Sequence, residues 1–212
     1  ILNATTFKEQ SEWLQLTHEV NFPCSKLYEN YAQDNSIIQI QKERNSKIKI
    51  AFLFERLIQH SPFKVMYSFF VALMKDEDFK SKYEVTVYSL NYFSEMPNHK
   101  ETLKKLTDIG VNVQFPVSTY TIDETYGSRV NRALKIRETL ILDQIDIMIA
   151  CFNSYDVLGF LFSTRTAPTQ VFWSHGGCNY DVVGIDKRIS HTGQFCDNYH
   201  FESFMIVKLF FL

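Results

Sequence analysis

His60 is the first residue of this 212-residue chain whose position could support chemistry. It ends a loop after a short β-branched and aromatic run, and Ser61-Pro62 directly after it is typical of an N-cap and first helical residue. The positive end of a helix lowers the pKa of an imidazole and attracts anions. A neutral histidine there can act as a base or hydrogen-bond a phosphate. The alternative is a surface or capping histidine without a chemical role.

Two more polar segments follow apolar runs. Asn153-Ser154-Tyr155-Asp156 comes after the most apolar run of the chain, where its side chains could hydrogen-bond a sugar or peptide, or cap the next helix. His175-Gly176-Gly177 follows Trp173 and contains two of only seven glycines. Adjacent glycines suit either a close approach of backbone to a ligand or an ordinary tight turn. Spacing alone leaves both alternatives open.

A competing interpretation makes the same region a zinc site. The pattern H-x2-C-x12-H-x4-C-x3-H is loosely zinc-like and comprises His175, Cys178, His191, Cys196 and His200. An apolar run over 182–185 separates its two halves, and no C-x-x-C pair is present. We therefore expect no metal-binding residues and keep the zinc-stabilised domain as the lesser alternative.

Composition excludes several classes of protein. Lys and Arg number 22 against 24 Asp and Glu, so no global positive field draws the chain to nucleic acid. Neither G-x-G-x-x-G nor a Walker A segment is present. The four cysteines form no C-x-x-C pair and read as free thiols of a reducing compartment. With no signal peptide and no apolar run of about 20 residues, we expect a cytoplasmic protein without a membrane span.

The elements that must position these residues alternate from residue 47 onward. Predicted strands cover 48–54, 83–90, 111–115, 145–152, 169–173 and 181–186. Predicted helices cover 63–75, 98–109, 129–143 and 155–162. Connections of this length require crossovers, which indicates an α/β fold: a Rossmann-like parallel sheet with helices on both faces. In such a sheet the loops that bind ligands follow the carboxyl ends of the strands, so the candidate binding loops are 55–62, 151–156 and 174–180.

The two ends of the chain differ from this middle. Residues 1–45 are polar with scattered apolar positions, which predicts a helical lead-in of one or two short helices with Pro23 between them. Residues 46–212 form the predicted Rossmann-like domain. The apolar end, Phe204–Leu212, indicates a strand or helix whose partner surface lies outside this chain, so we expect a fragment.

Several runs carry a family resemblance. Arg165–Trp173 (RTAPTQVFW) resembles the R-P-A-P-x-Q-x-x-W segment of the O-linked N-acetylglucosamine transferases and their bacterial relatives, including the adhesin-modifying N-glucosyltransferases. Asp181–Asp186 resembles the strand, roughly D-Y-I-I-x-D, that follows in that family. Its S-D-F-x-x-H-P loop places the active-site histidine on His60, and Asn153-Ser154-Tyr155 resembles its N/A-G-Y-T turn. The family's second histidine is Lys64 here.

The resemblance covers about residues 47–190 and implies the amino-terminal half of a GT-B glycosyltransferase, whose carboxy-terminal nucleotide-binding domain is missing from this chain. It implies metal-independent transfer of a sugar from a UDP-sugar donor to a protein or glycan acceptor, without a further cofactor. The isolated fragment would be inactive. It makes His60 the catalytic residue. The implied substrate-binding residues are Asn153, Tyr155, His175, Gly176 and Gly177. The rival expectation is a non-catalytic protein-interaction module.

Overall fold

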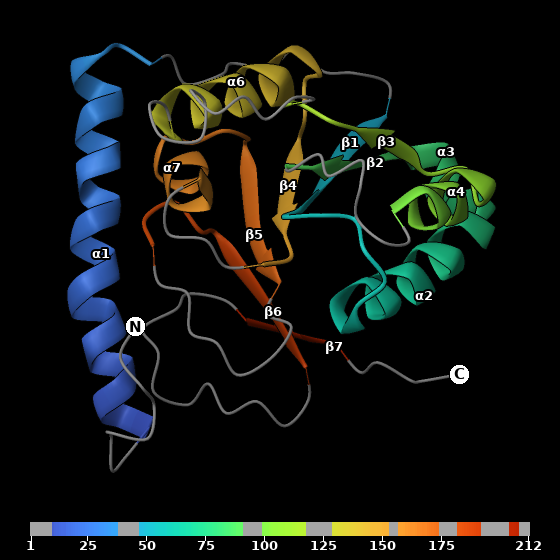
Figure 1. The fold of residues 1–212 in the computed structure, drawn as a ribbon, viewed down its shortest axis with the longest axis horizontal. Helices are drawn as coiled ribbons and strands as arrows, with labels where there is room; N and C mark the ends of the chain where they lie inside the picture. The colour runs from blue at the N-terminus through green and yellow to red at the C-terminus, as the bar shows by residue number, and fades with distance from the viewer. Residues whose placement is uncertain are drawn as a thin grey trace.

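The computed structural model describes residues 10–37, 47–90, 99–117, 129–152, 157–173, 182–191 and 204–207. Within these ranges, one sheet contains seven strands, and every neighbouring pair runs parallel (Figure 1). The strands are β1 (Ile48–Phe54), β2 (Tyr83–Ser89), β3 (Asn112–Gln114), β4 (Ile147–Ala150), β5 (Thr169–Trp173), β6 (Lys187–His191) and β7 (Phe204–Val207). The helices are α1 (Gln10–Asp34), α2 (Ser61–Lys75), α3 (Glu77–Lys82), α4 (His99–Asp108), α6 (Arg129–Leu142) and α7 (Val157–Ser163).

The strand order is β3-β2-β1-β4-β5-β6-β7, so the direction of chain progression reverses between β1 and β4. These two strands pair in register from Ile50 with Ile147 to Leu53 with Ala150. Because they are parallel, the loops that follow them leave from the same edge of the sheet. A reversal of this kind defines a doubly wound α/β fold and opens a crevice at the carboxyl ends of the two strands. The predicted Rossmann-like fold class is confirmed to this extent.

The two faces of the sheet carry separate apolar cores. Along β1 successive side chains alternate between them, as period two requires: Phe52 joins one core and Leu53 the other. The Phe52 core is closed by α2 and α4, and the Leu53 core by α6 and α7. Figure 1 shows α1 lying along the outer side of α7. Helices cover both faces, as predicted.

Most strands and helices lie where the apolar pattern predicts them. The bounds of β1 and β5 match, and the other predicted elements shift or shorten by a few residues at their ends. The short helix α3 was not predicted, since it buries no side chain and so shows no apolar periodicity. Its signal is the N-cap Asp76, whose carboxylate accepts a hydrogen bond from the Phe79 amide. In the described part of the chain no helix has the length and apolarity to cross a membrane.

The predicted lead-in is helical, but its expected division into short helices at Pro23 is wrong. Residues 10–34 form one helix with Pro23 inside it. Contacts with the rest of the molecule fall on both sides of the proline. Asn21 is buried before it, while after it Tyr28 packs edge-on against Phe160 with ring centroids 5.7 Å apart. Tertiary packing therefore holds the helix together across a residue that alone would end it.

The predicted strand over 181–186 is also wrong. Strand β6 begins only at Lys187, and residues 183–184 form a turn in which Gly184 has φ +90°. The carbonyl of Gly184 accepts a hydrogen bond from the Gln170 side chain rather than from a neighbouring strand. The apolar run therefore marks a half-buried turn, with Val182 in the core, and the sixth strand follows it.

Candidate functional site

The reversal of strand order places two loops beside each other at the carboxyl edge of the sheet. One loop, 55–60, connects β1 to α2, and the other begins at Cys151 after β4. The Cys151 amide still donates to the Leu53 carbonyl, so the strands stay paired up to the point where the loops begin. In doubly wound sheets this crevice is where ligands bind. It is the candidate site of this chain.

His60 stands at the start of α2, on this edge. It is the N-cap residue, with extended backbone (φ −132°, ψ 173°), and its carbonyl accepts the first helical hydrogen bond from Lys64 at 3.1 Å. Its own amide donates to the Ile58 carbonyl at 2.9 Å. The helix thus starts one residue earlier than predicted, and Pro62 occupies the first turn, where its missing N–H costs nothing.

The surroundings of the His60 imidazole favour its neutral form. Burial lowers its pKa below the ordinary 6.5, and the positive charge of Arg56 lowers the pKa further. Among the described residues no hydrogen-bond partner reaches the buried Nδ1 atom of His60 or the buried Nε atom of Arg56. A neutral ring can accept a proton from a hydroxyl group, and the guanidinium beside it can bind an anion.

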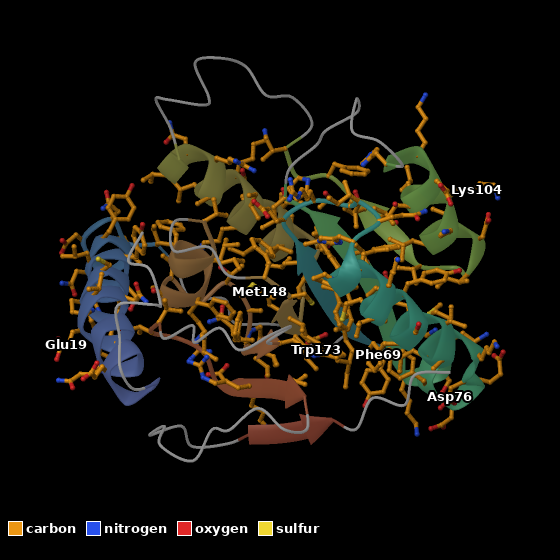
Figure 2. All side chains as sticks on the ribbon, turned by 60° about the horizontal axis from the view of Figure 1, so that its bottom comes forward. Glu19, Phe69, Asp76, Lys104, Met148 and Trp173 are labelled. Carbon is orange, nitrogen blue, oxygen red and sulfur yellow. The ribbon has the colours of Figure 1, made fainter. Side chains whose placement is uncertain are left out.

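Helix α2 is held against the sheet by aromatic contacts. Figure 2 shows Phe69 beside Trp173, the last residue of β5, and their ring centroids lie 5.1 Å apart at 85°. Phe70 meets Phe52 of β1 edge-on at 4.9 Å. These contacts fix the axis of α2 and therefore the place of its first residues.

Two residues that sequence reasoning missed support this edge of the sheet: His99 contacts the 55–60 loop, and Arg132 contacts the end of β2. The Nδ1 atom of buried His99, in the first turn of α4, lies 3.3 Å from the Leu57 carbonyl. A carbonyl only accepts, so the tautomer with hydrogen on Nδ1 fits this contact. Arg132 of α6 donates from Nη2 to the Leu90 carbonyl at 2.6 Å, and the Leu90 amide donates to the Phe54 carbonyl. No sequence signal links these residues to this edge, because each comes from a distant element.

Cys151 offers no nucleophile at this edge. The side chain is buried, and burial raises the pKa of its thiol far above the ordinary value. A thiol in this environment stays protonated and inert.

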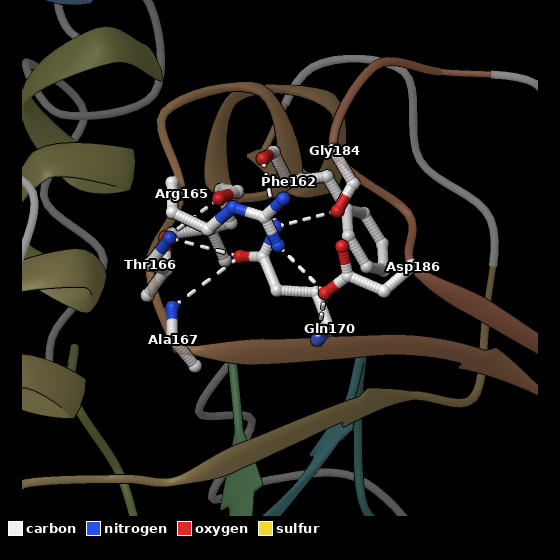
Figure 3. Close-up of polar contacts among 8 residues, drawn as sticks. Phe162, Arg165, Thr166, Ala167, Gln170, Gly184 and Asp186 are labelled. Carbon is white, nitrogen blue, oxygen red and sulfur yellow. Dashed lines mark hydrogen bonds and ion pairs between the residues drawn. The ribbon is translucent and has the colours of Figure 1, made fainter.

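The run that carries most of the family resemblance lies elsewhere. Figure 3 shows the buried Gln170 side chain at the centre of four hydrogen bonds. Its Oε1 atom accepts from the amides of Thr166 (2.8 Å) and Ala167 (3.4 Å). Its Nε2 atom donates to the carbonyls of Phe162 (2.9 Å) and Gly184 (2.7 Å). One amide group thereby closes the end of α7 and anchors the turn before β6.

Charged groups complete the same junction. The Asp186 carboxylate accepts a hydrogen bond from the Arg165 guanidinium at 2.6 Å and another from the backbone amide of Gln170 at 2.8 Å. The Arg137 guanidinium donates to the Thr164 carbonyl at 3.2 Å. Because Gln170 is the second residue of β5, this junction stands at the amino edge of the sheet, opposite His60. Folding alone accounts for the residue types of the run, without a substrate.

The other predicted site residues lie outside the described residues. These are Asn153, Tyr155, His175, Gly176 and Gly177. Of the five zinc-like positions only His191 falls in a described element, β6. Across the described ranges, no group of three or more His, Cys, Asp or Glu side chains is placed to hold a metal ion. His60 is therefore the one predicted site residue whose surroundings the structure describes.

Comparison with protein-family models finds no match to the chain, and comparison with curated proteins finds none either.

Proposed function

We propose that this chain is the amino-terminal half of a metal-independent GT-B glycosyltransferase. The enzyme would transfer a sugar from a UDP-sugar to a protein or glycan acceptor. The observation that carries the proposal is the position of His60, at the amino end of α2 where the strand order of a Rossmann-like sheet reverses, and its lowered pKa agrees with that role. The family resemblance of the run 165–173 supports the proposed fold, but it does not bear on the position of the substrate.

The geometry favours one role for His60 over another. A lowered pKa makes the ring a poor cation, so charge on a leaving diphosphate is met by Arg56 and the amides at the start of α2 rather than by the imidazole. The neutral ring instead orients the acceptor and takes its proton. In that step the acceptor oxygen bonds to the anomeric carbon of the sugar, the bond from that carbon to the diphosphate oxygen breaks, and UDP leaves.

The test is a donor screen with the full-length gene product, in which released nucleotide is measured for a panel of nucleotide sugars. We expect release from a UDP-sugar, and we expect His60→Ala to lower kcat on the order of 10²-fold or more, as for a positioned acid–base group. His18→Ala, on α1 and away from the sheet edge, is the matched control and should keep full activity.

Two results would count against the proposal. Full activity in His60→Ala removes this residue from the site. Absence of nucleotide release with every donor, in a protein whose circular dichroism shows a native fold, favours the non-catalytic interaction module instead.

A further inference from the structure

The loop that leads to His60 is tied to a second helix by a buried histidine. His99 is the first residue of α4 and is 5% exposed, and its Nδ1 atom lies 3.3 Å from the Leu57 carbonyl oxygen. Leu57 has no exposed surface, so water does not reach this carbonyl and His99 supplies its donor. A buried carbonyl that loses its donor is costly, which makes the contact a strong constraint on the loop.

The chain between Leu57 and His60 has little freedom. The Ile58 carbonyl accepts a hydrogen bond from the His60 amide at 2.9 Å, which closes a three-residue turn. The His60 carbonyl then accepts from the Lys64 amide at 3.1 Å, where α2 begins. The backbone of His60 therefore follows any displacement of the Leu57 carbonyl.

The ring of His99 is in turn packed against a residue from a third connection. Phe115 follows β3, and its ring centroid lies 5.7 Å from that of His99 at an interplanar angle of 52°. Strands β1, β2 and β3 are parallel neighbours, so the segments that follow them leave from the same edge of the sheet. Figure 1 shows α2 and α4, which close the same core, on one side of the sheet. Phe115, His99 and the 55–60 loop thus form one packed series that ends at His60.

We propose that His99 is a positioning residue, whose Nδ1–H group holds the Leu57 carbonyl so that the imidazole of His60 stays where it can take the proton of an acceptor. His99 is buried and acts only through the loop. The inference rests on the proposed function for the chemistry of His60, but the position of the His60 ring can be measured without any activity.

Two replacements of His99 separate its hydrogen bond from its packing. In His99→Asn the amide nitrogen is as many bonds from the backbone as Nδ1, so it can donate to the same carbonyl. His99→Leu fills much of the space of the ring and has no donor. Both replacements lose the ring contact with Phe115. Should His99→Leu not fold, His99→Gln, whose amide nitrogen is one bond farther out, replaces it.

The first measurement follows the His60 ring by NMR in a pH titration of histidine-labelled full-length protein. The signal is assigned by its loss in His60→Gln. Burial and the positive charge of Arg56 lower the pKa of this ring, and the negative charge of Glu55 acts in the opposite direction. A released loop exposes the ring to water, so the pKa of His60 should rise toward 6.5 in His99→Leu and stay at its wild-type value in His99→Asn.

Leu106→Ala is the matched control for a general loss of stability. Leu106 is buried in the same helix and the same core as His99 and Leu57, respectively, but lies two turns along α4 from His99. The pKa of His60 should be unchanged in this variant.

The second measurement is steady-state release of UDP from UDP-N-acetylglucosamine and from UDP-glucose, the donors that the family resemblance suggests. His99→Leu should lower kcat about tenfold or more, because the base is displaced from the acceptor, with little change in the KM of the donor. A higher pKa of the base should also move the acid limb of the kcat profile to higher pH. His99→Asn should keep most of the activity.

Three results overturn the proposal. The first is an unchanged pKa of His60 in His99→Leu. The second is an equal shift in His99→Asn or in Leu106→Ala, which would assign the effect to packing. The third is full activity of His99→Leu in an enzyme that His60→Ala inactivates. If the wild-type protein releases no UDP from any donor, the proposed function fails, and the titration alone decides whether His99 holds His60 in place.

Discussion

His60 combines three features that bear on its proposed role. It caps a 15-residue helix, it follows the strand at which the sheet order reverses, and its pKa is lowered by burial and by Arg56. The position could be read from the sequence, since Ser61-Pro62 marks the helix start. The contacts of His99 with the loop and of Arg132 with the end of β2 could not, because each contact joins residues 42 positions apart along the chain.

The lowered pKa of His60 has a consequence for stability. When the folded-state pKa lies below the unfolded value, the unfolded chain takes up the proton first as the pH falls. The contribution of His60 to stability is therefore complete above pH 6.5 and decreases as the pH falls from 6.5 through the folded-state pKa. Urea unfolding at about pH 7.5 and about pH 5 should show a smaller acid loss of stability in His60→Gln than in the wild type.

The wild type is the reference at each pH, so acid effects that do not involve His60 cancel in the comparison. An equal or larger acid loss in His60→Gln would mean that burial does not lower the pKa of this ring.

At the scale of elements, the segment from α7 to β6 shows that a recognised sequence motif need not lie at the candidate site. The run 165–173 has a specific pattern, and its glutamine sits in a buried junction between a helix end and a turn. That junction demands one donor and one acceptor group at the same point, which Gln supplies and few other residues do. The pattern therefore predicts local structure well and says nothing of where substrates bind.

Replacing Gly184 with alanine tests the packing of this junction, and the same replacement at Gly110 is the matched control. Gly184 has φ +90°, and a Cβ atom there would lie 2.1 Å from the Phe162 carbonyl oxygen. Gly110 has a similar φ of +84°, but its Cβ would meet only the end of the Met74 side chain at 3.6 Å. Gly110→Ala should cost about 1–2 kcal/mol of unfolding free energy for backbone conformation alone. Gly184→Ala should cost roughly 3 kcal/mol or more, because backbone must move as well.

Urea unfolding of the two variants measures this difference. Equal losses would show that the close approach of Gly184 to α7 is not required for folding.

The same comparison shows what sequence patterns could and could not predict. Short runs rich in β-branched and aromatic residues predicted β1 and β5 because both strands are buried on both faces over most of their length. The same kind of run at 181–186 misled, because it is a turn that contains Gly184. The proline signal misled at Pro23, where packing of Tyr28 on α7 outweighs the local tendency to break a helix. Contacts between distant elements decided both cases.

At the scale of the whole molecule, the two edges of the sheet carry different groups of polar side chains. The amino edge holds the Gln170 junction, in which the polar atoms of that side chain are satisfied by backbone. The carboxyl edge holds His60 and Arg56, each with a buried nitrogen that no described residue satisfies. The alternation of strands and helices predicts that such edges exist. Only the observed order β3-β2-β1-β4 shows which loops share the crevice.

Hydrogen–deuterium exchange of the full-length protein, with and without a UDP-sugar, tests this division most directly. The account predicts slower exchange in the presence of donor at amides 56–64, across the loop and first turn that contain His60, and unchanged exchange at 165–170. Protection confined to 165–170, or none at 56–64 under conditions where the donor binds, would contradict it.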